Sequence, residues 1–240
     1  MAVQRHFWHR QPPVDAAVTS RLARTLDQAR QIIDIGAGYD PWPRATELVD
    51  IRRWSDTEAR PVHIVDIECD RLPFADQSVD FAYTRHTLED IHNPWLLCRE
   101  MNRVARAGYI ETPSPASEFC RGVDGGKPSY RGYIHHRWFI WEEDGTLLFL
   151  PKYPIAEYVK VDEGGESRLT ECLDAQPITW NTYFAWSGSF KFHVLRHDID
   201  FDLRTNYGVV IMRAVTKSIE NARRFAEEYK VDETAFVATR

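Results

Sequence analysis

The sequence lacks the features that mark membrane, disulfide-linked and low-complexity proteins. No apolar run approaches the roughly 20 residues that a membrane-spanning helix needs, and the first ten residues hold no apolar stretch of the secretory type. The four cysteines form no C-x-x-C pair, so neither a disulfide framework nor a bound metal is expected. These absences predict a soluble cytoplasmic protein.

An excess of basic charge is also missing. The chain has 30 Lys and Arg residues against 36 Asp and Glu residues, a formal net charge of −6. This balance argues against a protein that binds nucleic acid through a basic surface, so we expect neither a nucleic-acid nor a membrane partner. With 240 residues, 43% of them hydrophobic, the chain can bury one core, and we treat residues 1–240 as a single domain of open oligomeric state.

Aromatic residues, in contrast, are concentrated in one part of the chain. Of the 30 aromatic residues, 16 lie between Tyr130 and Tyr207, including four of the eight tryptophans. Such rings stack on sugars and flat ligands, and they also pack extra β layers. Both interpretations stay open for this segment.

Short apolar runs predict a parallel sheet in the first half of the chain. Strands are expected over residues 31–35, 47–51, 62–66, 78–84 and 108–112, and helices over 15–30 and 94–106. Their alternation is typical of an α/β, Rossmann-like doubly wound sheet over residues 15–115. Residues 116–216 are β-prone and predict a β-rich extension on the substrate side, followed by a C-terminal helix and tail at 217–240.

Acidic residues follow three successive predicted strands. Asp34 ends the first, Asp50 the second and Asp66 the third. In an open parallel sheet, ligands bind at the carboxyl ends of the strands. Asp50 could accept both hydroxyls of a ribose, while Asp66 and the N–H of Ile67 could meet an adenine edge. The pattern therefore predicts a nucleoside pocket.

The missing glycines exclude the common phosphate-bearing cofactors. Gly36 and Gly38 allow a close approach of the backbone to a ligand, but the dinucleotide motif G-x-G-x-x-G needs a third glycine where Pro41 stands. A P-loop fails as well, because Pro128 takes the place of its Ser or Thr. A cofactor with adenosine and a zwitterionic tail but no phosphates fits better, which points to S-adenosylmethionine.

Several sequence blocks resemble the class I S-adenosylmethionine-dependent methyltransferases. Residues 33–38 (IDIGAG) are similar to the glycine motif of the family, and residues 72–80 (LPFADQSVD) to its LPF-x-D-x-S-x-D motif. Residues 85–89, 99–104 and 108–113 match the helix, helix and strand that follow. One departure is that the family's helix between the first two strands is reduced to a proline-rich stretch, residues 39–44.

The resemblance assigns residues to each part of the cofactor. It implies Asp34, Gly36 and Gly38 at the methionine end, Asp50 and Ile51 at the ribose, Asp66 and Ile67 at the adenine, and Thr84, Arg85 and His86 near the sulfonium and acceptor. Glu68 remains an alternative to Asp66 because the loop over 67–71 is longer than usual.

Candidates for catalysis and substrate binding follow the cofactor residues. His86 is a candidate general base, or only a polar residue at a strand end. His136, with His135, Arg137 and Trp138, could supply a base and an anion clamp for the substrate, or form a surface turn. The alternating acids of residues 196–202 are interpreted as a solvated face of a strand rather than a metal site.

The predicted substrate is a small molecule or saccharide, methylated on oxygen rather than nitrogen. The motif N/D-P-P-Y/F of many amino-group methylases is absent after the fourth strand, where residues 84–87 read TRHT. Two alternatives stay open, namely a non-catalytic S-adenosylmethionine-binding or scaffold protein of the same fold, and a nicotinamide-dependent oxidoreductase.

Overall fold

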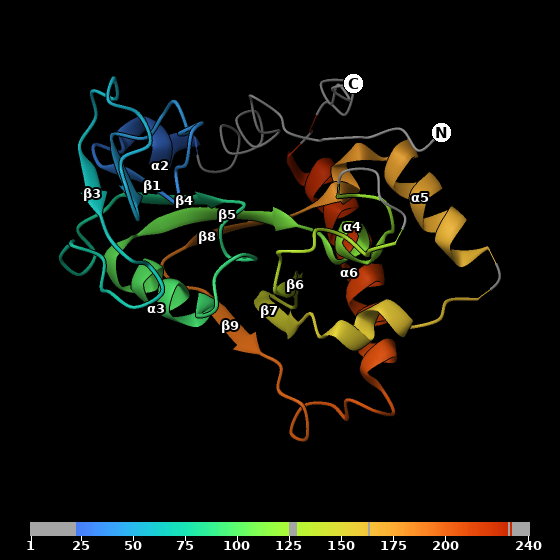
Figure 1. The fold of residues 1–240 in the computed structure, drawn as a ribbon. Helices are drawn as coiled ribbons and strands as arrows, with labels where there is room; N and C mark the ends of the chain where they lie inside the picture. Colours follow the sequence, from blue (N-terminus) through green and yellow to red (C-terminus); the bar gives the residue numbers. More distant parts are fainter. Residues whose placement is uncertain (1–22, 125–128, 163, 230, 232–240) are drawn as a thin grey trace.

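A six-stranded sheet forms the centre of the molecule (Figure 1). The computed structural model describes residues 23–124, 129–162, 164–229 and 231, so the N-terminal arm and the start of the first predicted helix lie outside the described residues. The sheet has the order β3 (Val62–Ile64), β2 (Glu47–Asp50), β1 (Ile32–Ile35), β4 (Phe81–Arg85), β5 (Ala107–Pro113) and β8 (Asn181–Ser187).

The first five strands of this sheet run parallel, and β8 pairs antiparallel with β5 at the edge. The strand order reverses between β1 and β4, and such a switch point opens a crevice at the carboxyl ends of the strands. This arrangement confirms the predicted Rossmann-like sheet.

Alternate residues of each strand face two different layers. Ile33 and Ile35 belong to a core with α3 (Pro94–Val104) and a second, smaller sheet. Ile32 belongs to the opposite core, with α2 (Ala23–Gln28) and α6 (Tyr207–Tyr229). Helix α3 forms there because Asn93 caps its start, with its Oδ1 accepting from Leu96 N at 3.3 Å, and Pro94 opens it.

The smaller sheet comprises β6 (Trp138–Glu143), β7 (Thr146–Pro151) and β9 (Lys191–Val194). Strand β7 lies in the middle, antiparallel to β6 and parallel to β9. Phe149 at the centre of β7 is fully buried in the same core as Ile33 and α3. The small sheet therefore packs against the main sheet, and side chains from both sheets form one hydrophobic core.

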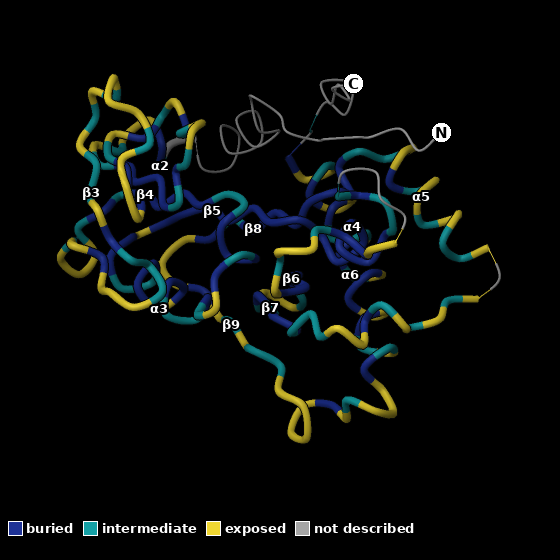
Figure 2. The backbone as a smooth tube through the Cα atoms, in the orientation of Figure 1, coloured by how far each residue is buried: buried dark blue, intermediate teal, exposed yellow. Residues whose placement is uncertain are grey.

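A further core joins the short helices to the small sheet. These elements are α4 (Pro115–Phe119), η1 (Pro154–Tyr158), α5 (Gly165–Ala175), η2 (Pro177–Trp180) and the first half of α6. Their buried residues include Phe119, Trp141 and Ile211. Figure 2 shows that most of the backbone of β4, β5 and β8 is buried, while exposed residues are frequent in the outer loops.

The second half of the chain differs from its prediction in three respects. Strand β8 completes the main sheet instead of an extension, α5 is a helix, and α6 begins at Tyr207 rather than at residue 217. The start of α6 contains Gly208 and consecutive β-branched residues, yet Tyr207, Ile211 and Ala214 share one buried helical face, and this burial outweighs local propensity.

Two smaller predictions differ as well. Residues 85–89 form no helix: Arg85 ends β4, and bends and turns follow it, since His86 has a left-handed φ of 51°. Residues 196–202 form a turn with Asp198 at φ 64° instead of a strand. Within the described ranges, no helix is both long and apolar enough to span a membrane.

Replacing Phe149 by alanine tests the attachment of the small sheet. The free energy of unfolding of the variant should be about 3–5 kcal/mol lower, because removal of a large ring leaves a cavity that the two packed sheets cannot fill. Chemical denaturation measures the difference. Tyr158→Ala is the matched control, since its ring is 81% exposed and its loss should change the free energy of unfolding little. Equal effects of the two variants would contradict the shared core.

Candidate functional site

The turn after β1 requires glycine at its first position. Gly36 has a φ of +73°, and a Cβ there would lie 2.3 Å from Oγ1 of Thr87. Thr87 belongs to the turn after β4, so the segments that follow β1 and β4 touch at Gly36. The turn therefore brings two strand ends together at the switch point of the sheet.

Asp34 lies beneath this turn and is 3% exposed. Its Oδ2 accepts a hydrogen bond of 2.7 Å from the backbone N–H of Trp42. Burial raises the pKa of Asp34 to about 7, against the effect of this hydrogen bond. The carboxyl group thus holds residues 39–44 against the sheet, in a stretch that forms no helix in the structure as in the prediction.

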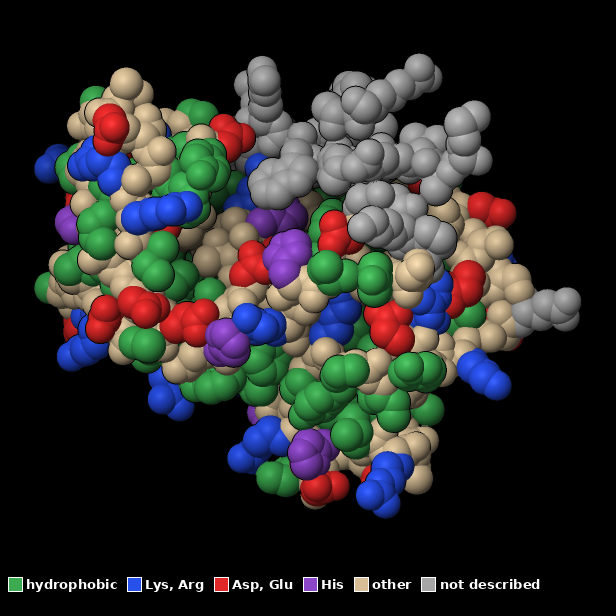
Figure 3. All heavy atoms as spheres, in the orientation of Figure 1, with side chains coloured by type: hydrophobic (Ala, Val, Ile, Leu, Met, Phe, Trp, Pro, Cys, Tyr) green, Lys and Arg blue, Asp and Glu red, His purple; other side chains and the backbone are tan. Residues whose placement is uncertain are grey.

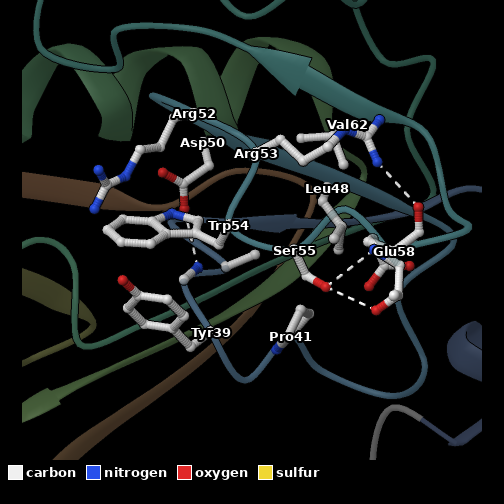
Figure 4. Close-up of a pocket in the computed structure, with 13 residues that line it drawn as sticks. Tyr39, Pro41, Leu48, Asp50, Arg52, Arg53, Trp54, Ser55, Glu58 and Val62 are labelled. Carbon is white, nitrogen blue, oxygen red and sulfur yellow. Dashed lines mark hydrogen bonds between the residues drawn. The ribbon is translucent and has the colours of Figure 1, made fainter.

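Asp50, at the end of β2, faces a pocket of about 190 Å³ that we call the Asp50 pocket (Figure 4). Its Oδ2 accepts from the backbone N–H of Gly38 at 2.9 Å, and its Oδ1 from that of Ile51 at 2.7 Å. These bonds fix the carboxylate at the pocket wall, and each oxygen keeps a lone pair for a further donor.

Aromatic rings form one wall of the Asp50 pocket. Tyr39 and Trp54 meet edge to face with ring centroids 4.3 Å apart, and the Arg52 guanidinium lies 3.6 Å from the centroid of Trp54. The indole N–H of Trp54 is buried and finds no hydrogen-bond acceptor among the described residues. A bound molecule with hydroxyl groups and ring acceptors would satisfy this N–H and Asp50 together.

The other predicted cofactor residues lie along the same edge of the sheet. Ile51 is 61% exposed, and Asp66 uses Oδ1 to accept from the N–H of Glu68 at 3.0 Å. Thr84 is buried and donates to Ile35 O. Ile67 packs partly buried against the core that contains Ile35. Ile51, Asp66 and Ile67 therefore follow β2 and β3 as predicted, whereas Thr84 lies within β4 and not past its end.

Arg85 forms a buried ion pair at the end of β4. Its Nε lies 3.3 Å from Oε1 of Glu111, whose other oxygen accepts from Tyr109 at 2.7 Å. Asn181 of β8 also donates to Glu111 Oε1 at 2.8 Å. The pair fastens β4, β5 and β8 to one another, so Arg85 has a structural contact beside its predicted role at the cofactor.

A second pocket of about 240 Å³, the His86 pocket, opens beyond β4 and β5. It is lined by His86, Glu89, Asp90, Pro113, Ser117, Asp124, Tyr133, His135, His136, Trp180 and Asn181. Figure 3 shows histidine and acidic side chains gathered near the middle of this face. The pocket brings together three of the predicted residues, His86, His135 and His136.

His86 occupies the inner part of the His86 pocket. The backbone N–H of His86 donates to the backbone oxygen of Glu111 at 2.9 Å, and the Nδ1 of its ring lies 3.3 Å from Oε1 of Glu89. Burial, and then the charge of Arg85, lowers the pKa of His86 to about 4. The imidazole is therefore neutral at neutral pH, the state that can accept a proton.

Glu89 is a pocket residue that the sequence analysis missed. It is 1% exposed, and neither carboxylate oxygen finds a hydrogen-bond donor in the part of the chain that the structure describes. Burial raises the pKa of Glu89 to about 7. Its sequence position gave no signal, because residues 85–89 match a helix block and the turn that buries Glu89 depends on the left-handed His86.

His136 is held by a buried carboxylate from α4. Its Nδ1 lies 2.5 Å from Oε1 of Glu118, and the Lys152 ammonium donates to Oε2 of the same residue at 2.6 Å. Burial opposes ionisation of Glu118, but Lys152 and His136 outweigh it and leave the pKa lowered. Burial likewise opposes the charge of His136, and Glu118 outweighs it, so the pKa of His136 is raised.

Two predicted substrate residues point elsewhere. The ring of Trp138 packs in the core, with its N–H donating to Ile91 O at 2.8 Å and Trp95 6.2 Å away. Arg137 donates from Nε to Asp90 O at 2.9 Å. Most of the tryptophans of this segment are likewise buried core residues, and Trp180 is the one that also lines the His86 pocket.

The comparisons with known proteins identify the first part of the chain. Residues 16–110 match the model of a family described as the methyltransferase domain. No curated protein matches the chain at a significant level.

Several solved structures of low sequence identity are similar to part of the chain. A proposed methyltransferase from Bacillus halodurans is 17% identical over 40% of this chain and 52% of its own, with a TM-score of 0.29. An S-adenosylmethionine-dependent methyltransferase from Mesorhizobium loti is 15% identical over 57% and 64%, with a TM-score of 0.33. The N-terminal domain of EvdMO1 with S-adenosylhomocysteine bound is 19% identical over 56% and 60%, with a TM-score of 0.34.

The chain therefore spans about half to two thirds of the length of these proteins. The assignment of residues 16–110 rests on the family match and on the observed strand order.

Replacing Glu118 by glutamine tests the buried contacts behind the His86 pocket. The variant should lose about 3–5 kcal/mol of unfolding free energy, because Lys152 and His136 lose the charge that compensates them. Glu220→Gln is the matched control, as its pair with Lys217 is exposed and should contribute at most about 1 kcal/mol.

The pH dependence of the free energy of unfolding gives a second test of the Glu118 contacts. A lowered pKa stabilises the folded state above the ordinary Glu value of 4.5, and this contribution is lost as the pH falls below it. The difference between wild type and Glu118→Gln should therefore be full above pH 4.5 and shrink below. A difference that does not change with pH would contradict an ionised Glu118.

Proposed function

We propose, on the premise that residues 16–110 belong to the class I S-adenosylmethionine-dependent methyltransferase domain family, that the chain methylates a hydroxyl oxygen of a small molecule or saccharide. The observation that carries the proposal is the His86 pocket, which opens at the carboxyl ends of β4 and β5, next to the turn after β1. S-adenosylmethionine is the cofactor of this domain. The acceptor and the atom methylated are the proposed part.

The Asp50 pocket fits the adenosine half of the cofactor. Asp50 has acceptor capacity for ribose hydroxyls, and the Trp54 indole N–H has no acceptor among the residues described. The rings of Tyr39 and Trp54 offer apolar surface to a flat base. With the ribose at Asp50, the chain of the cofactor runs past Gly38 and Gly36 toward the end of β4.

For methyl transfer at the His86 pocket, the main task of the protein is then to align the acceptor hydroxyl with the methyl group and sulfur of the cofactor. When bound, S-adenosylmethionine would supply the methyl group, which would leave the sulfur for the acceptor oxygen while the S–C electron pair stays on the sulfur as a neutral thioether. The hydroxyl proton passes to the neutral imidazole of His86 as the C–O bond forms. Holding two reactants in line is worth about 7–11 kcal/mol, and the protein supplies this by the walls of the two pockets.

The composition of the His86 pocket supports a hydroxylated acceptor. Tyr133 and Trp180 provide ring faces of the kind that stack on sugars, and Asp124 and Asn181 provide hydrogen-bonding groups. The volume of about 240 Å³ fits a small molecule or one sugar unit rather than a nucleic-acid strand.

Asp50→Ala tests the cofactor site. Binding of S-adenosylhomocysteine should weaken at least about 10-fold, which is the loss of about 1.4 kcal/mol expected for hydrogen bonds to a charged group. Isothermal titration calorimetry measures the change. Asp76→Ala is the matched control, since Asp76 is exposed and precedes β4, at the opposite edge of the sheet.

The same titration with NADPH tests the alternative that the chain is a nicotinamide-dependent oxidoreductase. Arg52 and Arg53 in the Asp50 pocket could meet a phosphate. Binding of NADPH without binding of S-adenosylhomocysteine would contradict the proposal in favour of an oxidoreductase.

His86→Asn tests the acceptor side. Asparagine tolerates the left-handed backbone at this position, so the fold should persist. Loss of a positioned proton acceptor should lower kcat about 100-fold or more, with the affinity for S-adenosylmethionine unchanged. The assay follows labelled methyl transfer into a fractionated metabolite extract. An unchanged kcat would remove His86 from the mechanism, and methylation of nitrogen in the product would contradict the proposed acceptor.

A further inference from the structure

Three metal-ligating side chains converge at the mouth of the His86 pocket. Asp90 follows the turn after β4, and His135 and His136 precede β6, 45 residues later in the sequence. One ligand atom from each residue lies within 4.8 Å of the other two. No spacing motif joins these residues, so the sequence predicts no metal here and indicates His136 as a base and His135 as a substrate ligand.

The separations are close to those of a coordination sphere. The Nε2 atoms of His135 and His136 each lie 3.7 Å from Oδ1 of Asp90. Ligands at about 2.0–2.2 Å from a tetrahedral zinc ion lie about 3.3–3.6 Å from one another. The two imidazole rings meet at 74°, with centroids 4.4 Å apart, so they converge without stacking. The two separations that involve Asp90 therefore exceed those of a zinc site by only a few tenths of an ångström, and the two histidine donors lie within 4.8 Å of each other.

Glu118 orients one of the two histidines for this role. Its carboxylate is fully buried and binds Nδ1 of His136, which directs Nε2 of that ring toward Asp90. A carboxylate behind the second nitrogen of a ligating histidine is a recurring feature of protein metal sites, where it fixes the tautomer and the ring plane. Lys152 in turn fixes Glu118 from its other oxygen.

Glu89 provides an independent observation at the same place. Its carboxylate lines the His86 pocket beside Asp90, is 1% exposed and has no hydrogen-bond donor within the described residues. Nδ1 of His86 lies 3.3 Å from its Oε1, but this contact does not meet the geometry of a hydrogen bond. A buried carboxylate in this state calls for a positively charged or donating ligand in the pocket.

We propose that Asp90, His135 and His136 bind one divalent transition-metal ion, with zinc as the preferred ion, whose open coordination position faces the His86 pocket. Two imidazoles and one carboxylate form a ligand set that both zinc and iron(II) use, and three protein ligands leave a fourth position for a water or substrate oxygen. Asp90 and His135 are partly exposed, which gives the ion a path of entry.

A catalytic role of the metal ion rests on the proposed function, whereas the binding of the ion to Asp90, His135 and His136 does not. A cation at this mouth would hold the acceptor hydroxyl as a Lewis acid and ease the loss of its proton to His86. This narrows the acceptor to a molecule whose hydroxyl can reach the ion and the methyl group together.

Zinc titration of the full chain, stripped with a chelator, tests the site. One zinc ion should bind per chain by calorimetry and by elemental analysis after dialysis. His135→Ala should weaken binding at least about 10-fold, by comparison with the cost of disturbing a metal ligand's surroundings. His135 is exposed, so its loss leaves the fold intact.

His197→Ala serves as the matched control. His197 is an exposed histidine whose Nδ1 lies 2.7 Å from Asp198, but no second histidine belongs to that pair. Its replacement should leave zinc affinity unchanged. Asp90→Asn should weaken binding as His135→Ala does, and Co²⁺ should show visible absorption bands that both variants lose.

The proposal is overturned if no zinc binds, or if His135→Ala and Asp90→Asn bind it as the wild type does. Binding of S-adenosylhomocysteine to the chelated protein is measured separately. If S-adenosylhomocysteine does not bind, the proposed function is contradicted and the zinc result is unaffected. If S-adenosylhomocysteine binds but zinc does not, only the proposed metal site is overturned.

Discussion

The parallel register of β1 with its two neighbours is the constraint on which the site depends. Asp34 lies opposite Leu48 of β2 and Tyr83 of β4, so the three strands end at one level. The segments that follow them must therefore meet above the same edge of the sheet. Gly36 and Thr87 show how closely they meet, since no side chain fits between them. The Asp50 and His86 pockets lie on either side of this contact.

The second half of the molecule positions the acceptor side. Glu118 of α4, fixed by Lys152 at the end of β7, holds His136 at the mouth of the His86 pocket. Strand β8 contributes Asn181 to the same pocket and to the buried carboxylate of Glu111. In the proposed function, the residues after the family domain complete the acceptor side of a site whose cofactor side the domain provides.

The sequence predicted the parts of this site that are encoded locally. The acids after three strands and the order of the blocks over residues 32–115 predicted the sheet and the cofactor edge. Partners that are distant in the sequence were missed. Glu89 becomes a pocket residue because His86 adopts a left-handed turn. Asp90 meets His135 because Arg137 and Trp138 donate hydrogen bonds to the backbone of residues 89 and 91. Trp138 looked like a substrate residue by composition, but burial against Trp95 decides its place.

We propose that one bound cofactor joins the two pockets across the end of β1. A crystal structure of the protein with S-adenosylhomocysteine would show this binding mode. We expect the adenosine in the Asp50 pocket, the ribose hydroxyls on the Asp50 carboxylate and the sulfur directed toward His86. An adenosine bound away from Asp50, or a sulfur that points away from the His86 pocket, would exclude this binding mode.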